Sequence, residues 1–309
     1  MGPTASGKTA AAMALADRFP VELINVDSAQ IYRDMDIGTA KPDAETLARY
    51  PHHLMDICDP SERYSAAQFR ADALGLMNDI IQRGKVPLLV GGTGLYYRAL
   101  ENGLADMPEA DEAIRKEIFY EAAERGWGAL HAVLAEVDPE SAARIEPTDT
   151  QRIQRALEVY RKTGKTLTEH WQEQRAGEQR DELPYKLLKL AVWPQDRAEL
   201  HRRIEQRFGQ MMEAGFLAEV AALKSRDDLD LECPSMRAVG YRQLWQHLEG
   251  EFPLDEAVRK GIVASRQYAK RQITWLRSES GLEVFEATDP ELASQLADRV
   301  EAFIAWNRP

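Results

Sequence analysis

Cysteine is scarce in this chain of 309 residues, and long apolar runs are missing. Cys58 and Cys233 lie far apart and form no Cys-x-x-Cys pair, which argues against a zinc ribbon or a dithiol redox site. This usage is typical of the reducing cytosol, so we expect a cytoplasmic protein. No apolar run reaches the ~18 residues that a membrane helix needs, and no signal peptide is visible. The length favours one large or two modest domains, with no membrane partner.

Basic residues are outnumbered, with 39 Lys and Arg against 51 Asp and Glu and a net charge of −12. This balance excludes a uniformly basic nucleic-acid coat protein, but it allows a local basic groove because charge can be segregated. The 44% hydrophobic and 29% charged residues exclude a disordered or collagen-like chain. The adjacent His52 and His53 are only a weak signal for a metal site.

The N-terminal residues 2–9 match the phosphate-binding loop pattern G-x-x-x-x-G-K-S/T. In this pattern backbone N–H groups cradle phosphate oxygens, Lys8 supplies a positive charge and the Thr9 hydroxyl can ligate Mg²⁺. Residues 10–19 are rich in alanine and predict a helix, whose N-terminus favours an anion. The competing interpretation is a glycine-rich turn without a ligand. The candidate phosphate-binding residues are Gly2, Pro3, Thr4, Ala5, Ser6, Gly7, Lys8 and Thr9.

Strands and helices alternate in the rest of the chain. The predicted strands are residues 21–26, 86–90 and 187–193, all short and apolar. A helix is predicted over 64–83, with Ser65 as its N-cap and Gly84 at its end. This order favours an α/β fold, a doubly wound, mostly parallel sheet with a phosphate loop. Because only Met1 precedes the loop, we expect that a short native N-terminal strand is missing.

The strand signal vanishes between about residues 106 and 183. Helices are predicted over 111–125, from a break at Gly126-Trp127-Gly128 to about 136, from Asp138-Pro139 onward, and over 148–163. We interpret residues 106–183 as an inserted all-helical domain, and residues 1–105 with 184–309 as the α/β core. The end of the core is predicted to be helical over 196–213, 216–225, 236–249 and 254–277.

Three basic stretches interrupt the acidic chain. Residues 257–277 hold six basic side chains and no acidic one, with Tyr268 and Trp275 interleaved. Residues 151–155 and 235–242 form the other two. Such segregation is typical of a groove for a nucleic-acid backbone. The competing interpretation is a set of solvated helix faces with local salt bridges.

Position alone leaves the roles of four further residues open. Asp27 and Thr93 follow predicted strands, where ligands bind in parallel sheets. Asp27 fits a magnesium ligand and a general base equally well, and Thr93 fits a turn residue or a ligand contact. Arg203 and Arg207 lie on one face of a predicted helix, where they can clamp phosphates or pair with nearby acids.

Seven strings are highly specific when taken together, whereas the phosphate loop alone is not. They are G-P-T-A-S-G-K-T (2–9), V-D-S-A-Q-I-Y (26–32), D-I-G-T-A-K-P (36–42), G-G-T-G-L-Y (91–96), D-T-Q-R-I-Q-R-A-L-E-V-Y-R-K-T-G-K (149–165), R-A-V-G-Y-R-Q (237–243) and A-K-R-Q-I-T-W-L-R (269–277). With them the chain resembles the bacterial tRNA dimethylallyltransferases, or tRNA isopentenyl transferases, over about residues 2–277.

The resemblance implies an alkyl transfer. The N6 amine of the adenine 3′ of the anticodon attacks dimethylallyl diphosphate, and diphosphate leaves. It implies that the phosphate loop, with Arg203 and Arg207, holds the diphosphate together with Mg²⁺ on Thr9. Asp27 is then the candidate proton acceptor and Thr93 a contact of the bridging oxygen. The adenine has to be extruded from the stacked anticodon loop.

The resemblance also implies the surface that contacts tRNA. The residues are Asp27, Ser28, Ala29, Gln30, Thr93, Arg115, Gln151, Arg152, Ile153, Gln154, Arg155, Arg237, Ala238, Val239, Gly240, Tyr241, Arg242, Lys270, Arg271, Gln272, Ile273, Thr274, Trp275, Leu276 and Arg277.

Two other functions use parts of the same pattern. A small-molecule or nucleotide kinase, or an adenylate isopentenyltransferase, shares the phosphate loop, but neither predicts the basic stripe over 257–277. A non-catalytic tRNA-binding module does not need Asp27 or an intact loop. No heptad seam is visible, so we expect a monomer, and nothing in the sequence implies a protein partner.

Overall fold

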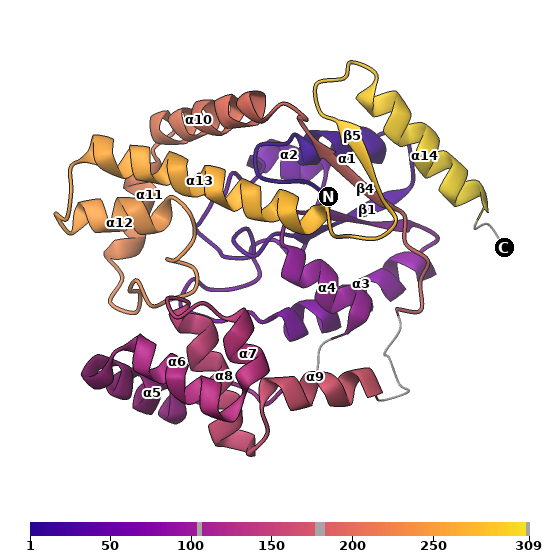
Figure 1. The fold of residues 1–309 in the computed structure, drawn as a ribbon. Helices are drawn as coiled ribbons and strands as arrows, with labels where there is room; N and C mark the ends of the chain where they lie inside the picture. Colours follow the sequence, from indigo (N-terminus) through magenta and orange to yellow (C-terminus); the bar gives the residue numbers. More distant parts are fainter. Residues whose placement is uncertain (104–106, 177–182, 307–309) are drawn as a thin grey trace. The chain divides into compact units, whose positions relative to one another are not determined.

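The computed structural model describes residues 1–103, 107–176 and 183–306 (Figure 1). The chain divides into two compact units, Met1–Leu100 with Tyr185–Pro309 and Glu101–Pro184. We call them the α/β unit and the helical unit and describe each by itself. The predicted boundary at 105/106 lies outside the described residues, and the one at 183/184 lies beside the observed division.

All strands of the α/β unit pair in parallel. The first sheet has the order β2 (His52–His53), β1 (Val21–Val26) and β3 (Val86–Gly91), and β4 (Lys189–Trp193) pairs with β5 (Leu282–Glu286). The register of β1 and β3 runs from Val21 opposite Val86 to Val26 opposite Gly91. The parallel pairing of strands separated by helices confirms the predicted α/β class.

Met1 and Gly2 lie between the two sheets. The Met1 amino group donates to the Leu190 carbonyl (2.7 Å), and the Val192 N–H donates to the Met1 carbonyl (3.0 Å). On the other side, the Gly2 N–H donates to the Gly91 carbonyl (3.3 Å). These two residues therefore connect β3 to β4 at the point where the phosphate loop begins.

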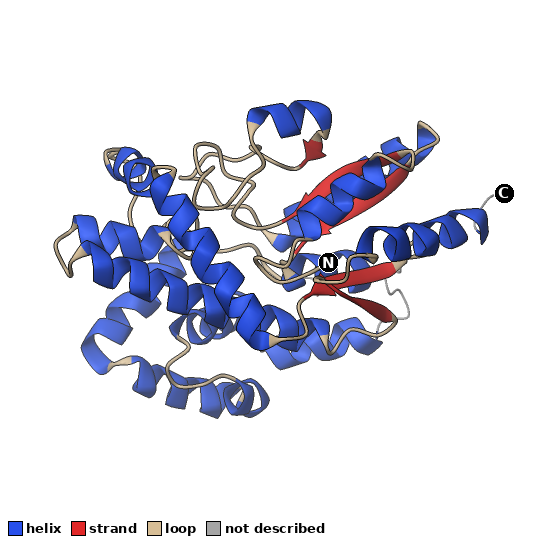
Figure 2. Cartoon of the chain, turned by 90° about the horizontal axis from the view of Figure 1, so that it is seen from above, coloured by secondary structure: helices blue, strands red, loops and turns tan. Residues whose placement is uncertain are grey.

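Side chains of β4 alternate between two cores, as the period of a strand requires. Val192 packs with Leu15 of α1 (Lys8–Ala16) and Leu296 of α14 (Leu292–Trp306). Ala191 and Trp193 instead pack with Leu276, at the end of α13 (Leu254–Leu276). Helices thus cover both faces of this strand, which Figure 2 shows from above.

Local signals explain most of the helix ends. In α3 (Ala66–Gln82), Ser65 and Gln68 form a capping box, and Gly84 follows the helix with φ of 73°. The predicted helix over 236–249 is wrong at its start, because α12 begins at Tyr241 after Gly240 with φ of 91°. The remaining helices of this unit are α2 (Ala44–Arg49), α4 (Gly94–Asn102), α10 (Arg197–Glu213) and α11 (Phe216–Lys224), and α12 ends at Leu248.

The helical unit contains no strand in its described residues. Its helices are α5 (Glu112–Arg125), α6 (Trp127–Val137), α7 (Pro139–Arg144), α8 (Thr150–Thr163) and α9 (Leu167–Ala176). Asp111, Asp138 and Asp149 cap α5, α7 and α8 with their side chains. The predicted break at residues 126–128 is confined to Gly126. Across both units, no described helix has the length and hydropathy of a membrane-spanning segment.

Candidate active site

The phosphate loop leads directly into the N-terminus of α1. Ala5 and Gly7 both have positive φ, 61° and 91°, which turns successive N–H groups toward one side of the loop. Gly7 is the N-cap, and no side chain caps this helix. The N–H groups of the first turn are therefore left for a ligand, and the helix dipole favours an anion there.

Two partly buried cations face this loop. Burial lowers the pKa of Lys8 to about 8, against the opposing effect of Asp27, and the charge of Arg207 lowers it further. Burial likewise lowers the pKa of Arg207, again opposed by Asp27. Neither cation forms an ion pair within the described residues. Because two desolvated positive charges at one place are unfavourable, this site is suited to a bound anion.

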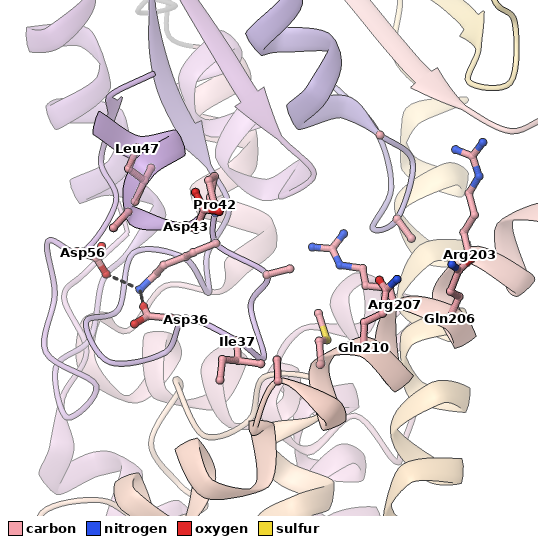
Figure 3. Close-up of a pocket in the computed structure, with 17 residues that line it drawn as sticks. Asp36, Ile37, Pro42, Asp43, Leu47, Asp56, Arg203, Gln206, Arg207 and Gln210 are labelled. Atoms are coloured by element: carbon pink, nitrogen blue, oxygen red, sulfur yellow. Dashed lines mark hydrogen bonds and ion pairs between the residues drawn. The ribbon is translucent and has the colours of Figure 1, made fainter. Parts of the chain in front are cut away.

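A cavity of about 900 Å³ opens beside the loop. Ala5, Gly7 and Arg207 line one side, and residues 36–37 and 40–43 line the other. Figure 3 shows the Arg207 guanidinium pointing into this space, whereas Arg203, which also belongs to the lining, extends in another direction from the same helix. Arg203 Nε donates to Glu199 Oε1 (2.7 Å), so of the two arginines Arg207 is the stronger candidate for holding an anion.

Asp27 and Thr93 meet at the carboxyl ends of β1 and β3. The Thr93 N–H donates to the Val26 carbonyl (3.2 Å), and Thr93 Oγ1 accepts from the Ser28 N–H (3.0 Å). Asp27 Oδ1 accepts from the Ala29 N–H (2.9 Å), which closes a turn and leaves the second carboxylate oxygen for another partner. The geometry therefore brings the two predicted catalytic residues together.

Tyrosines of α4 and α13 lie close enough to the same carboxylate to be affected by its charge. Burial, and after it the charge of Asp27, raises the pKa of both Tyr97 and Tyr268. For Tyr268, a hydrogen bond with Thr93 opposes that shift. The Tyr97 ring stacks on Trp275 with centroids 5.8 Å apart. The site thus combines an anion-binding loop with a carboxylate that has tyrosines in its neighbourhood.

The comparisons with known proteins agree with this geometry. The family model described as IPP transferase matches residues 30–279, and the one described as isopentenyl transferase matches residues 1–55. A tRNA dimethylallyltransferase of Dechloromonas aromatica is 56% identical over 99% of this chain and 96% of its own length. One of Alkalilimnicola ehrlichii is 57% identical over 99% of this chain and 94% of its own.

Solved structures show the same relationship. The tRNA isopentenylpyrophosphate transferase of Bacillus halodurans is 38% identical, with a TM-score of 0.69, and the match covers 99% of this chain and 96% of that one. A eukaryotic dimethylallyltransferase acting on tRNA is 30% identical, with a TM-score of 0.80 over 100% of this chain and 79% of that one. This chain belongs to the tRNA dimethylallyltransferase family.

In this family member, the strings predicted to contact tRNA are partly interior. The side chains of Ile153, Tyr241, Gln272 and Leu276 are buried, so they do not present a surface to RNA in this structure. Exposed residues of the same strings are Ser28, Gln151, Arg152, Arg242, Lys270, Arg271, Thr274 and Arg277. Partly buried ones are Ala29, Gln30, Gln154, Ala238, Val239, Ile273 and Trp275, and Gly240 is buried.

Gln272 has a structural task that the sequence does not reveal. Its Oε1 accepts from the Thr4 N–H (2.8 Å), and its Nε2 donates to the Gly92 carbonyl (2.9 Å). One buried amide of α13 thus ties the phosphate loop to the end of β3. The string 269–277 therefore supports the active site from inside and presents its basic residues outside.

Glutamates that hold other groups are the other feature that sequence analysis missed; of them Glu158 is fully buried and Glu219 is partly buried. In the helical unit, Glu158 accepts from the Asp111 N–H (2.6 Å) and from guanidinium groups of Arg115 (3.0 Å) and Arg155 (3.0 Å). In the α/β unit, Arg237 pairs with Glu232, and Tyr241 donates to Glu219 (2.6 Å). Glu158 lies within a predicted string, but an acid in an amphipathic helix is expected at its surface.

Proposed function

We propose that this chain transfers the dimethylallyl group from dimethylallyl diphosphate to the N6 amine of the adenine 3′ of the anticodon in tRNA. The proposal depends on two neighbouring features. The first is helix α1, which no side chain caps, together with the desolvated cations Lys8 and Arg207. The second is the carboxylate of Asp27 at the end of β1. The first part suits a diphosphate leaving group, and the second suits a proton acceptor.

The chain's own residues divide the chemistry between them. The N–H groups of residues 7–9, Lys8 and Arg207 hold the diphosphate and stabilise the charge that builds on it as the C1–O bond breaks. Asp27 orients the N6 amine and takes its proton as the N6–C1 bond forms. Thr93 is held by Val26 and Ser28 close to this point, where it contacts the bridging oxygen.

The residues present fit a magnesium ion. The Thr9 side chain forms no hydrogen bond in the described part of the chain, and its hydroxyl offers the oxygen ligand that Mg²⁺ prefers. No group of three or more His, Cys, Asp and Glu suited to a metal occurs among the described residues, so a metal here would depend on the diphosphate and water for its other ligands. Bound there, Mg²⁺ would neutralise charge on the leaving group.

The acceptor is an RNA because exposed basic residues flank the site. Lys270, Arg271 and Arg277 are exposed on or just after α13, the helix whose interior face reaches the phosphate loop. In the helical unit, Arg152 is exposed as well. We propose that these side chains contact the phosphates of the anticodon stem and loop, and that the chain acts as a monomer.

Mass spectrometry of nucleosides tests the function directly. A tRNA incubated with the protein, dimethylallyl diphosphate and Mg²⁺ is expected to yield dimethylallyl-adenosine at the position 3′ of the anticodon. Replacing the tRNA by AMP separates this activity from an adenylate isopentenyltransferase, and labelled ATP separates it from a kinase. Modification of AMP but not tRNA, or transfer of the ATP phosphate, would contradict the proposal.

A further inference from the structure

The loop formed by residues 36–42 lines the cavity, but no role has been assigned to it so far. This string, D-I-G-T-A-K-P, supplies Asp36, Ile37, Ala40 and Lys41 to the lining of the cavity. In Figure 3 the loop lies across the cavity from Arg207. Its position therefore sets the width of the space in front of the anion-binding loop.

One carboxylate holds the start of this loop. Glu219, on α11, accepts from the backbone N–H groups of Asp36 (2.9 Å) and Ile37 (2.7 Å) with Oε2, and from that of Gly38 (3.0 Å) with Oε1. The Tyr241 hydroxyl donates to the same Oε1 (2.6 Å). Three successive N–H groups around a carboxylate form an anion-binding nest, here filled by the protein itself.

The other end of the loop is also tied down. Gln30 Nε2 donates to the carbonyls of Thr39 (3.1 Å) and Ala40 (3.3 Å). The almost fully buried Lys41 ammonium donates to the Tyr32 carbonyl (2.5 Å) and pairs with Asp36 and Asp56. Gln30 and Tyr32 follow Asp27 directly, so the loop connects Glu219 to the string that carries the proposed proton acceptor.

The loop packs tightly against aromatic side chains at the starts of α11 and α12. A Cβ on Gly38 would lie 2.0 Å from the Phe216 ring and 2.6 Å from that of Tyr241. Phe216 and Tyr241 are both fully buried, and their rings pack edge to face with centroids 4.9 Å apart. The buried rings therefore limit how closely the loop can approach α11, and the hydrogen bonds to Glu219 hold the loop at that distance.

We propose that Glu219 is a positioning residue for the allylic diphosphate: it holds residues 36–38, of which Asp36 and Ile37 form part of the cavity wall opposite Arg207. The proposal rests on the proposed function. Such a wall contacts the donor equally in the ground state and the transition state. Loss of the wall should therefore raise KM for the donor while kcat changes little.

Glu219→Gln is the first test, because it keeps the shape and turns one accepting oxygen into a donor that faces backbone N–H groups. We expect KM for dimethylallyl diphosphate to rise about tenfold, the effect of losing one charge-assisted hydrogen bond. kcat and tRNA affinity should stay near those of the wild type. Glu213→Gln is the matched control, because Glu213 is exposed on α10 and outside the network.

Two further variants keep the proposal testable if Glu219→Gln folds poorly. Tyr241→Phe removes one hydrogen bond to the carboxylate and should raise the donor KM about two- to threefold. Glu219→Ala empties the nest, and added formate should lower its KM again by occupying the same N–H groups.

Several outcomes would overturn the proposal. An unchanged donor KM in both Glu219→Gln and Tyr241→Phe, or a fall in kcat and melting temperature alone, would assign Glu219 a purely structural role. Absence of rescue by formate in a folded Glu219→Ala protein would speak against the nest. A wild-type protein that fails to modify tRNA would instead contradict the proposed function, so the two failures are distinguishable.

Discussion

Two clusters of semi-buried cations, one in each unit, differ in how their charges are compensated. In the helical unit, Arg115 and Arg155 share the buried carboxylate of Glu158, and we call this cluster balanced because each cation has an acidic partner within the protein. In the α/β unit, Lys8 and Arg207 form no ion pair among the described residues, and burial lowers the pKa of both. A balanced cluster maintains a shape, whereas an unbalanced one is completed by a ligand.

This contrast teaches where a substitution should act. We expect changes around the phosphate loop to act on turnover, because they alter the positive charge available to stabilise the donor's diphosphate. We expect changes around Glu158 to act on folding and on tRNA affinity, because no reacting group depends on them. The following substitutions test whether effects on turnover and effects on folding separate in this way.

The largest effect is expected for Asp27→Ala. Loss of the proton acceptor for N6 should lower the single-turnover rate about 10²–10⁴-fold. Some loss of tRNA affinity is expected too, because the proposed function also has this carboxylate orient the adenine. Rapid-quench measurement of dimethylallyl-adenosine at saturating substrates gives the rate. Asp79→Ala, at an exposed position of α3, is the matched control.

A magnesium titration of Asp27→Ala separates the two roles that position alone leaves open. If Asp27 is the base, excess Mg²⁺ leaves the rate low. Recovery of a near wild-type rate at high Mg²⁺ would make Asp27 a metal ligand and remove it from proton transfer.

Lys8→Ala should have the next largest effect. Without its charge on the leaving diphosphate, kcat/KM for the donor should fall about 10²–10³-fold, as when one donor to a developing oxyanion is lost. tRNA affinity, measured by filter binding, should be unchanged, since Lys8 faces the donor. Lys85→Ala, which removes a surface ion pair with Glu22, is the control. An equal fall in tRNA affinity would contradict the division between donor and tRNA sites.

The pH dependence gives a second readout for Lys8. Its pKa in the free protein is lowered to about 8, so it loses its charge as the pH rises through that value. kcat/KM for the donor should therefore decline above pH ~8 in the wild type, because this ratio reports ionisations of the free enzyme. The decline should be absent from Lys8→Ala.

The same division explains what could be predicted from the sequence. Strands β1 and β3 and helices α3, α5 and α8 carry local signals, namely apolar runs and capping residues, and were predictable. Strand β5 is amphipathic and lies in an acidic stretch, and β2 has two residues, so neither has a signal of its own. Both exist because a parallel neighbour pairs with them.

The site residues that belong to a local sequence motif or follow a strand were predictable. Those that act through hydrogen bonds to distant segments were not. Gly7 and Lys8 stand at fixed spacing, and Asp27 and Thr93 follow strands. Glu219 and Glu158 are separated in sequence from most of the groups they hold. Their roles depend on tertiary contacts, since Gly38 and Glu219 are 181 positions apart in the sequence. A glutamate in a helix otherwise predicts a solvated surface position.

Glu158→Gln tests the balanced cluster. The amide cannot match the charges of Arg115 and Arg155, so we expect a loss of about 1–3 kcal/mol in the free energy of unfolding at neutral pH. Urea unfolding measures this loss, and turnover at saturating tRNA should be unchanged. Glu146→Gln, at an exposed position of the same unit, is the control. A large fall in kcat without a loss of stability would break the comparison between the units.

The sign of the pH effect on this variant follows from the pKa of Glu158. Burial alone would raise this pKa, but hydrogen bonds from the Asp111 N–H, Arg155 and Arg115 hold it below 4.5. A depressed folded-state pKa contributes stability above the unfolded value, and that contribution is lost as the pH falls through the folded value. The stability gap between wild type and Glu158→Gln should therefore narrow below pH ~4.5.

The smallest effect is expected for Arg152→Ala, and it examines the RNA face of the helical unit. Arg152 is largely exposed, with only a 3.4 Å ion pair to Asp149, whereas its neighbour Arg155 is engaged by Glu158. If Arg152 neutralises one phosphate, its loss should reduce the slope of log Kd against log salt by about 0.7–0.9. Arg125→Ala removes the same charge from an exposed position of α5 outside the predicted strings, and its slope should stay at the wild-type value. Equal slopes for the two variants would show that residue 152 is an ordinary solvated position. A reduced slope for Arg152→Ala alone, with unchanged stability, would show that exposed cations of this unit contact RNA while paired ones maintain its fold.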